Sequence, residues 1–108
     1  MPVKKIYLDT TVSLLDWVEE NRPVIIDTLY DNIFDFLESG DDSKTVLKVE
    51  NRPTFNHINM ESYGVTFDFM LIRSDILVTI DSMLEYYESI EDYEKCAKLM
   101  KTKKDFNL

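Results

Sequence analysis

The spacing of apolar residues changes along this chain, and each change limits the structure that a segment can form. Apolar residues recur at steps of three and four over residues 23–38 and again from residue 74 onward, which is the period of an amphipathic helix. Between these segments, residues 45–50 and 63–72 alternate at every second position, as strands with one buried face do. Helices and strands segregated in this way predict an α+β fold.

The first third of the chain is expected to add one strand and one short helix. Residues 3–8 alternate weakly and suggest a third strand. The aspartate and two threonines at 9–11 offer side-chain oxygens to cap a helix over residues 12–21. Pro23 suits the first turn of the next helix, where its missing N–H is not needed, and Gly40 suits the left-handed residue at that helix's end.

The last third is expected to form a helical hairpin. The apolar stripe that starts at Ile76 changes phase after Ile90, and Ser89 and Asp92 are candidate caps for a second helix. A continuous helix with a phase slip is the alternative. The expected architecture is two N-terminal helices, a small antiparallel sheet and a C-terminal helical hairpin on the sheet's aromatic face, in a single domain of residues 1–108. The predicted core residues are Leu29, Ile33, Phe67, Phe69, Ile80 and Met83.

Composition excludes several classes of protein. The lone Cys96 has no partner in the chain, so a disulfide scaffold is excluded. No apolar run approaches the roughly 18–20 residues that span a bilayer, and a cytoplasmic protein without a membrane partner is expected. With 12 basic and 21 acidic residues, the formal net charge of −9 argues against direct nucleic-acid binding, which requires a basic face.

Acidic residues are gathered into two segments that contain no lysine or arginine, residues 23–43 and 74–94. In the first segment they recur at helical spacing and share one face, and in the second they do the same. The candidate partner-binding residues are Asp27, Asp31, Asp35, Glu38, Asp81, Glu85 and Glu88.

Three interpretations of the acidic faces remain open: a solvated helix surface, a contact for a basic protein, and a metal site. Carboxylates one helical turn apart lie roughly 5.4–6 Å apart, near the phosphate spacing of a nucleic-acid strand, so mimicry of a nucleic acid is geometrically allowed. The chain has no calcium-loop spacing, and no metal or other cofactor is expected. The lysines of residues 95–104 either complement a helix C-terminus or form a basic contact patch.

The sequence offers few candidates for catalysis. His57 is the only histidine and falls in the predicted 51–62 loop, where it is a candidate contact residue. Cys96 lies among helical residues where a small packed side chain is expected, so an inert thiol is the simpler interpretation. Glycine-rich phosphate loops and His-Glu-x-x-His motifs are missing from the sequence, and no catalytic residue is assigned.

Residues 5–12, Lys-Ile-Tyr-Leu-Asp-Thr-Thr-Val, resemble the opening of PIN-domain nucleases, in which a strand ends in Asp-Thr-Asn before a helix. In that family the first aspartate binds a divalent metal that activates water. Asp9 matches that aspartate, whereas Thr11 stands in place of the asparagine. The remaining sequence lacks the alternating strand–helix pattern of a parallel sheet. The resemblance implies a metal-dependent nuclease using Asp9, and a helix cap is the simpler role for this residue.

Residues 83–104 resemble the UVR-type helical hairpin of excision-repair subunits and protease adaptors. The second helix of that family carries an aromatic-Glu-x-Ala-Ala-x-Leu-Arg-Asp core, which here reads Tyr-Glu-Lys-Cys-Ala-Lys-Leu-Met-Lys over residues 93–101. Cys96 replaces the first alanine, and Met100-Lys101 replaces the Arg-Asp pair. The resemblance implies docking on other proteins rather than catalysis.

The function expected from these patterns is that of a small acidic, non-catalytic module that binds a basic protein as an adaptor, inhibitor or regulator. Chains of this kind are common among phage-encoded inhibitors, which is an association with a class of proteins only. The alternatives are a nucleic-acid mimic, a self-assembling structural component that forms a homo-oligomer, and the Asp9 nuclease.

Overall fold

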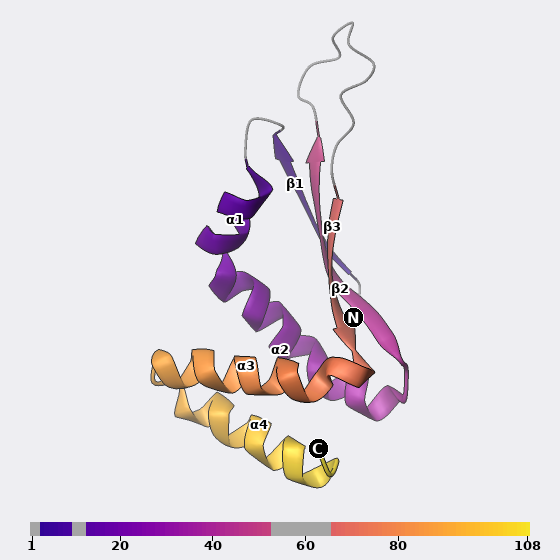
Figure 1. Ribbon diagram of the computed structural model, residues 1–108, viewed down its shortest axis with the longest axis vertical. Coiled ribbons are helices and arrows are strands. Elements are labelled where there is room, and N and C mark those ends of the chain that lie inside the picture. The colour runs from indigo at the N-terminus through magenta and orange to yellow at the C-terminus, as the bar shows by residue number, and fades with distance from the viewer. Residues whose placement is uncertain (1–2, 10–12, 53–65) are drawn as a thin grey trace, which may run out of the picture. The chain divides into compact units, whose positions relative to one another are not determined.

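The computed structural model describes residues 3–9, 13–52 and 66–108, and it has the α+β class expected from the sequence (Figure 1). The elements follow in the order β1 (Lys4–Asp9), α1 (Leu14–Glu20), α2 (Arg22–Ser39), β2 (Ser43–Arg52), β3 (Thr66–Ile72), a 3-10 turn η1 (Arg73–Asp75), α3 (Ile76–Ser89) and α4 (Tyr93–Asp105). No helix among the described residues is long and apolar enough to cross a membrane.

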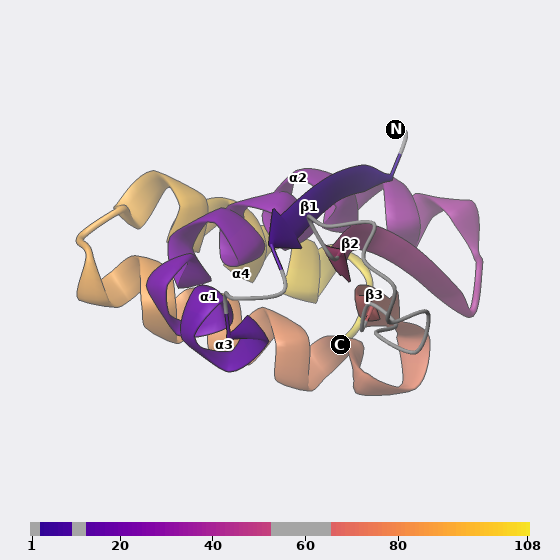
Figure 2. The same cartoon turned by 90° about the horizontal axis from the view of Figure 1, so that it is seen from above.

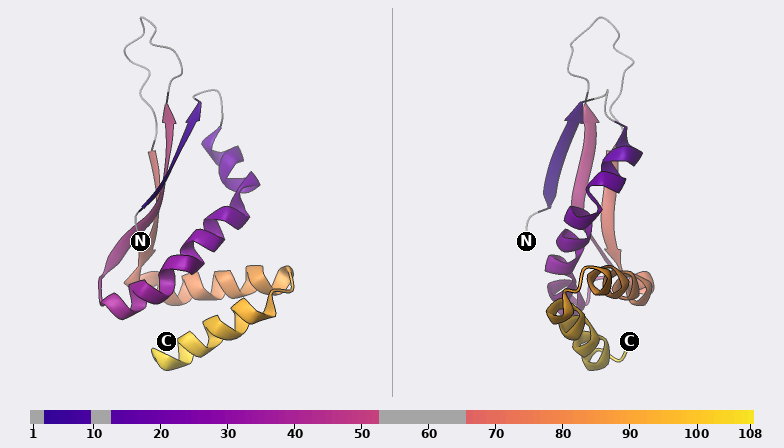
Figure 3. Two further views of the ribbon diagram at one scale, coloured as in Figure 1. Left: turned by 180° about the vertical axis from the view of Figure 1, so that it is seen from behind. Right: turned by 90° about the vertical axis from the view of Figure 1, so that its left-hand side faces the viewer.

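The three strands form a mixed sheet: the expected antiparallel arrangement of the second and third strands is confirmed, whereas β1 is parallel to its neighbour rather than antiparallel. Their order is β1-β2-β3 (Figure 2). β1 pairs with β2 in parallel, with Lys4 opposite Leu47 and Tyr7 opposite Glu50. The β3 arrow points the opposite way from those of β1 and β2 (Figure 3). A parallel pair needs a crossover of a dozen or more residues, which α1 and α2 provide between β1 and β2.

Contacts divide the chain into two compact units. Unit 1 takes in residues 1–29 and 45–70, so its described part holds β1, α1, the start of α2 and most of β2 and β3. Its buried apolar residues are Ile25, Val46, Leu47 and Val49. The single-domain expectation stays a prediction.

Unit 2 takes in residues 30–44 and 71–108, and so contains the end of α2 together with α3 and α4. Its buried apolar residues are Ile33, Phe36, Leu37, Leu71, Ile76, Ile80, Met83, Tyr87 and Leu99. Apart from Leu71 of β3, these residues lie on helices, and those of α2 and α3 follow the three- and four-residue steps seen in the sequence.

The ends of the helices are set by single residues. Gly40 adopts the left-handed conformation, with φ of 75°, directly after α2, as predicted. The N-cap of α1 is Ser13, whose Oγ accepts a hydrogen bond from the Asp16 amide at 3.4 Å. The expected cap at residues 9–11 is therefore wrong, because the helix begins later than the sequence suggested.

The C-terminal segment forms the predicted hairpin, and α3 and α4 lie side by side (Figure 3). Asp92 is the N-cap of α4, and its side chain accepts a hydrogen bond from the Lys95 amide at 3.4 Å. Glu91 has a left-handed φ of 61°, while the Asp92 and Glu91 amides donate to the carbonyls of Tyr87 and Glu88. This is a Schellman motif, which turns the chain sharply enough to end α3 before α4 begins.

The predicted core is only partly correct. Ile33, Ile80 and Met83 are fully buried, whereas Leu29 and Phe69 are half-buried. Phe67 is 37% exposed, so its assignment to the core is wrong. It lies near the start of β3, where the alternating pattern fixes the face of the strand but not the depth of burial.

Candidate protein-binding surface

Three carboxylates form an exposed row on the second half of α2. Asp31, Asp35 and Glu38 are exposed and follow each other at steps of four and three, so they lie on one face of the helix. Along the axis the row extends about 10 Å, at 1.5 Å per residue. None of the three is ion-paired with any residue that the structure describes. We call these three residues the α2 acidic stripe.

The buried face of α2 explains why the stripe faces solvent. Ile33, Phe36 and Leu37 have exposed fractions of 4% or less, and they lie on the opposite side of the helix from the stripe. Asp27, the fourth predicted contact on this helix, is half-buried, belongs to unit 1 and has an interaction of its own. Asp27 therefore differs from the three exposed carboxylates in its burial and in having an interaction within the protein.

The three candidate residues of α3 are also exposed, but they differ in their contacts. Asp81 is engaged within the hairpin, since its Oδ1 accepts a hydrogen bond from Lys103 Nζ at 3.0 Å. Glu85 and Glu88 have no ion pair with a residue in the described part of the chain. These two glutamates are thus available to a partner, whereas Asp81 would have to give up its ion pair with Lys103 to bind a cation of the partner.

Several lysines of α4 bind the protein itself, which the sequence did not predict. Lys98 Nζ lies 4.2 Å from the centre of the Phe34 ring, and Lys95 Nζ lies 4.9 Å from that of Tyr87. Tyr30 joins the two rings, with edge-to-face contacts at 5.0 Å to Phe34 and 5.4 Å to Tyr87. These cation–π contacts hold α4 against the end of α2 through Phe34 and against α3 through Tyr87.

The remaining cations of α4 have different roles. Lys103 and Lys104 lie in the last turn of α4, where they complement the helix dipole as expected. Lys101 and Lys104 are exposed and have no ion pair with the described residues. Most lysines of this segment therefore stabilise the fold, and only Lys101 and Lys104 are left exposed and unpaired among the described residues.

Two titratable groups in unit 2 have raised pKa values. Burial is the main cause of the raised pKa of Tyr30, with Asp92 and Asp31 adding to it and Lys95 opposing it. Burial also raises the pKa of the Cys96 thiol, assisted by Glu88 and Asp92. Cys96 Sγ donates to the Leu84 carbonyl at 3.8 Å. A thiol in this setting stays protonated at neutral pH, which agrees with an inert cysteine.

The structure does not bring the candidate catalytic residues together into a site within its described part. Asp9 ends β1, and His57 lies outside the described residues. Over residues 3–9, 13–52 and 66–108, no group of three His, Cys, Asp or Glu side chains could hold a metal ion.

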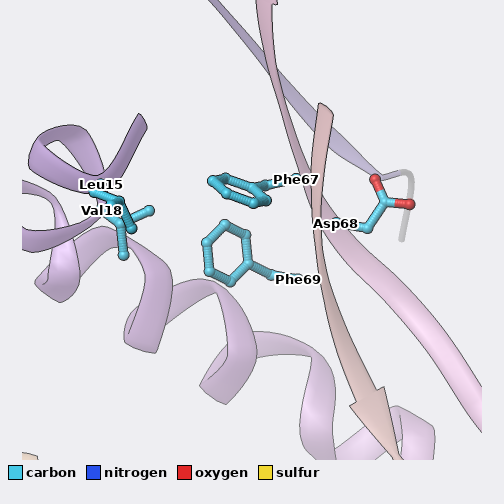
Figure 4. A pocket seen from close by; sticks show the side chains of 5 residues that line it. All are labelled: Leu15, Val18, Phe67, Asp68 and Phe69. Carbon is cyan, nitrogen blue, oxygen red and sulfur yellow. The ribbon is translucent and has the colours of Figure 1, made fainter. Parts of the chain in front are cut away.

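A small apolar pocket of about 230 Å³ lies in unit 1, between α1 and β3. Leu15, Val18, Phe67 and Phe69 line its apolar wall, while the Asp68 side chain points away from the two rings (Figure 4). The aromatic residues of β3 therefore face α1 across this pocket. The separate helical and strand periods could not indicate which helix lies on which face.

Similarity to known proteins assigns no function to this chain. No protein-family model matches the chain, and no curated protein or solved structure matches it.

Proposed function

We propose that this protein is a non-catalytic binding module that recognises a basic surface of another protein through the α2 acidic stripe. The observation that supports the proposal is the row of three exposed carboxylates, unpaired within the described chain, on a helix segment without a lysine or arginine. Glu85 and Glu88 of α3 are the second part of the proposed surface.

The energetic argument is that the stripe is unfavourable for the isolated protein. Like charges at steps of three or four on a helix each cost roughly 0.2–0.5 kcal/mol, and Asp31–Asp35 and Asp35–Glu38 are two such pairs. Lysines interspersed among them would keep the protein soluble without this cost. A basic partner would relieve the repulsion on binding, and the net charge of −9 would accelerate the encounter.

The test is affinity capture from a lysate at low and high salt, with a variant of the stripe beside a matched control. The stripe variant is D31N/D35N/E38Q. The control, D16N/E19Q/E20Q, removes three exposed carboxylates from one side of α1. The proposal expects one basic protein to be captured by the wild type and the control, and to be lost from the stripe variant and at high salt. Capture of the same partner by all three proteins at both salt concentrations would contradict it.

A nucleic-acid mimic is a narrower form of the same proposal. The stripe carboxylates repeat at about 4.5–6 Å along the helix axis, comparable to the spacing of backbone phosphates. If the captured partner binds DNA or RNA, an oligonucleotide should displace this protein from it in competition. Failure to compete would leave a basic protein surface outside the nucleic-acid site as the target.

The parallel β1–β2 pair is the one observation that favours the alternative of a nuclease. Asp9 ends β1 opposite Arg52, at the carboxyl end of two parallel strands, where ligands bind in sheets of this kind. This alternative predicts cleavage of nucleic acid that depends on Mg²⁺ or Mn²⁺ and is abolished by Asp9→Asn. Equal activity in the wild type and the variant would trace the cleavage to a contaminant.

A further inference from the structure

The outer face of α4 exposes an apolar row that is separate from the α2 acidic stripe. Tyr93, Ala97 and Met100 follow each other at steps of four and three, so they share one face of the helix. Tyr93 is 62% exposed and Met100 is 63% exposed, although both side chains are large and apolar. The buried residues Leu99 and Thr102 lie on the other side of α4.

This row borders a groove between the two helices of the hairpin. The groove has a volume of about 280 Å³, and Leu84 and Glu88 of α3 line it together with Tyr93, Cys96 and Met100. A side chain from outside the molecule could therefore bury itself against both helices. An exposed apolar row beside a groove is typical of a surface that binds another protein, and the neighbouring charges determine which partner fits it.

The charges beside the row identify an occupant. Glu94 stands in the first turn of α4, and Lys101 follows two turns later on the same side of the row. Glu94 and Lys101 are both exposed and have no ion pair with a described residue. Because one end of this face is acidic and the other basic, the face is complementary to itself when a second copy is turned end to end.

We propose that two copies of this chain associate through α4, with the two helices antiparallel. A twofold axis between Ala97 and Met100 places Ala97 of each subunit opposite the partner's Met100. The small alanine makes room for the long methionine, so the helices can approach closely. The same axis places Tyr93 opposite the partner's Lys104, whose methylene stem and ammonium group both suit an aromatic ring.

The flanking charges fit the same arrangement. A twofold axis perpendicular to two antiparallel helices brings the same flank of each together, so Glu94 meets the partner's Lys101 and Lys101 meets the partner's Glu94. The contact thus contains two equivalent ion pairs around an apolar centre. This inference does not depend on the proposed function, because the α2 acidic stripe contributes nothing to it; Glu88, which lines the groove, is the one residue that both surfaces share.

The first test measures mass against concentration by sedimentation equilibrium, starting from the 12.8 kDa monomer. We expect a monomer–dimer equilibrium for the wild type. Met100→Lys should raise its dissociation constant at least about tenfold, a change of about 1.4 kcal/mol. Val78→Lys is the matched control, because Val78 is 69% exposed on α3 and lies outside the proposed contact. A wild type that is monomeric at every concentration overturns the proposal, as does equal weakening by both variants.

A second test separates this arrangement from any other dimer. Glu94→Lys makes the flank wholly basic and Lys101→Glu makes it wholly acidic, so each variant alone should be monomeric. Mixed in equal amounts, the two should form a heterodimer in which both ion pairs are restored, one with the original polarity and one with the polarity reversed. Circular dichroism of each variant confirms that α4 is intact. Dimers formed by either variant alone, or the lack of a heterodimer on mixing, would refute the antiparallel contact.

Discussion

Arg73 should contribute more to stability than any surface charge on this protein, because it closes the C-terminal end of α2. Its Nε donates to the Asp41 carbonyl at 2.8 Å, and its Nη2 donates to the Phe36 carbonyl at 2.9 Å. The guanidinium also lies 4.8 Å from the centre of the Phe36 ring. Arg73→Ala removes all of these contacts but keeps the backbone hydrogen bond from the Arg73 amide to the Asp42 carbonyl.

The size of the effect follows from the contacts that are lost. A hydrogen bond to a charged group contributes about 1.5–3 kcal/mol, and because the Asp41 contact is exposed and the Phe36 contact only part-buried, we take about 1 kcal/mol for each bond. The cation–π contact adds about 0.5–1 kcal/mol. The free energy of unfolding should therefore fall by about 2–3 kcal/mol, which lowers Tm by roughly 10 °C in a chain of this length.

The assay is thermal and urea unfolding followed by circular dichroism, with Arg22→Ala as the matched control. Arg22 is exposed at the N-terminal end of the same helix, where a positive charge opposes the dipole, so its removal should leave Tm unchanged or slightly higher. Arg73→Lys should restore less than half of the free energy lost in Arg73→Ala. A lysine ammonium group lacks the planar fork of donors with which the guanidinium binds both carbonyls at once. A Tm for Arg73→Ala within 2 °C of the wild type would refute this account.

Three further predictions concern the hairpin and its contacts. Glu91→Gly should raise the free energy of unfolding by about 1 kcal/mol, because glycine adopts a positive φ without steric cost; an unchanged urea midpoint would contradict this. Asp92→Ala should lower it by about 1 kcal/mol through loss of the α4 cap, whereas Asp105→Ala, at the far end of α4, should not. The raised pKa of Tyr30 stabilises the fold below the ordinary tyrosine pKa, and this contribution is lost as the pH rises through the folded value. As the pH rises above 10, the free energy of unfolding of Tyr30→Phe should therefore fall less than that of the wild type. In an absorbance titration the wild type should show one more late-ionising tyrosine than the variant.

The helices were predictable because local chemistry determines them. The apolar steps of 23–38 and 74–100, the left-handed Gly40 and the Asp92 cap all lie within the segments that they define. Glu91 was not predictable in the same way, since a non-glycine residue with a positive φ leaves no signal in composition. It is held there by the hydrogen bonds that end α3.

The pairing of the strands could not be predicted from their periods. Alternation shows that residues 3–8 form a strand and which side chains share a face, but it does not determine the direction of the neighbouring strand. The two-helix crossover between β1 and β2 is long enough to permit the parallel pair, but its length does not require it. The pocket that Phe67 shares with Leu15 and Val18 of α1 could not be predicted either, because it brings together residues about fifty positions apart.

The structure reduces the set of acidic residues that are candidates for binding a partner. Seven carboxylates on two helices have equivalent spacing in the sequence, and nothing there distinguishes one from another. Folding brings Lys103 to Asp81, while Asp27 is half-buried and engaged. Lysines that could have neutralised more of the acidic surface are held over aromatic rings instead. A partner that recognises charge should therefore depend more on the α2 acidic stripe than on α3, and D31N/D35N/E38Q should weaken binding more than D81N/E85Q/E88Q.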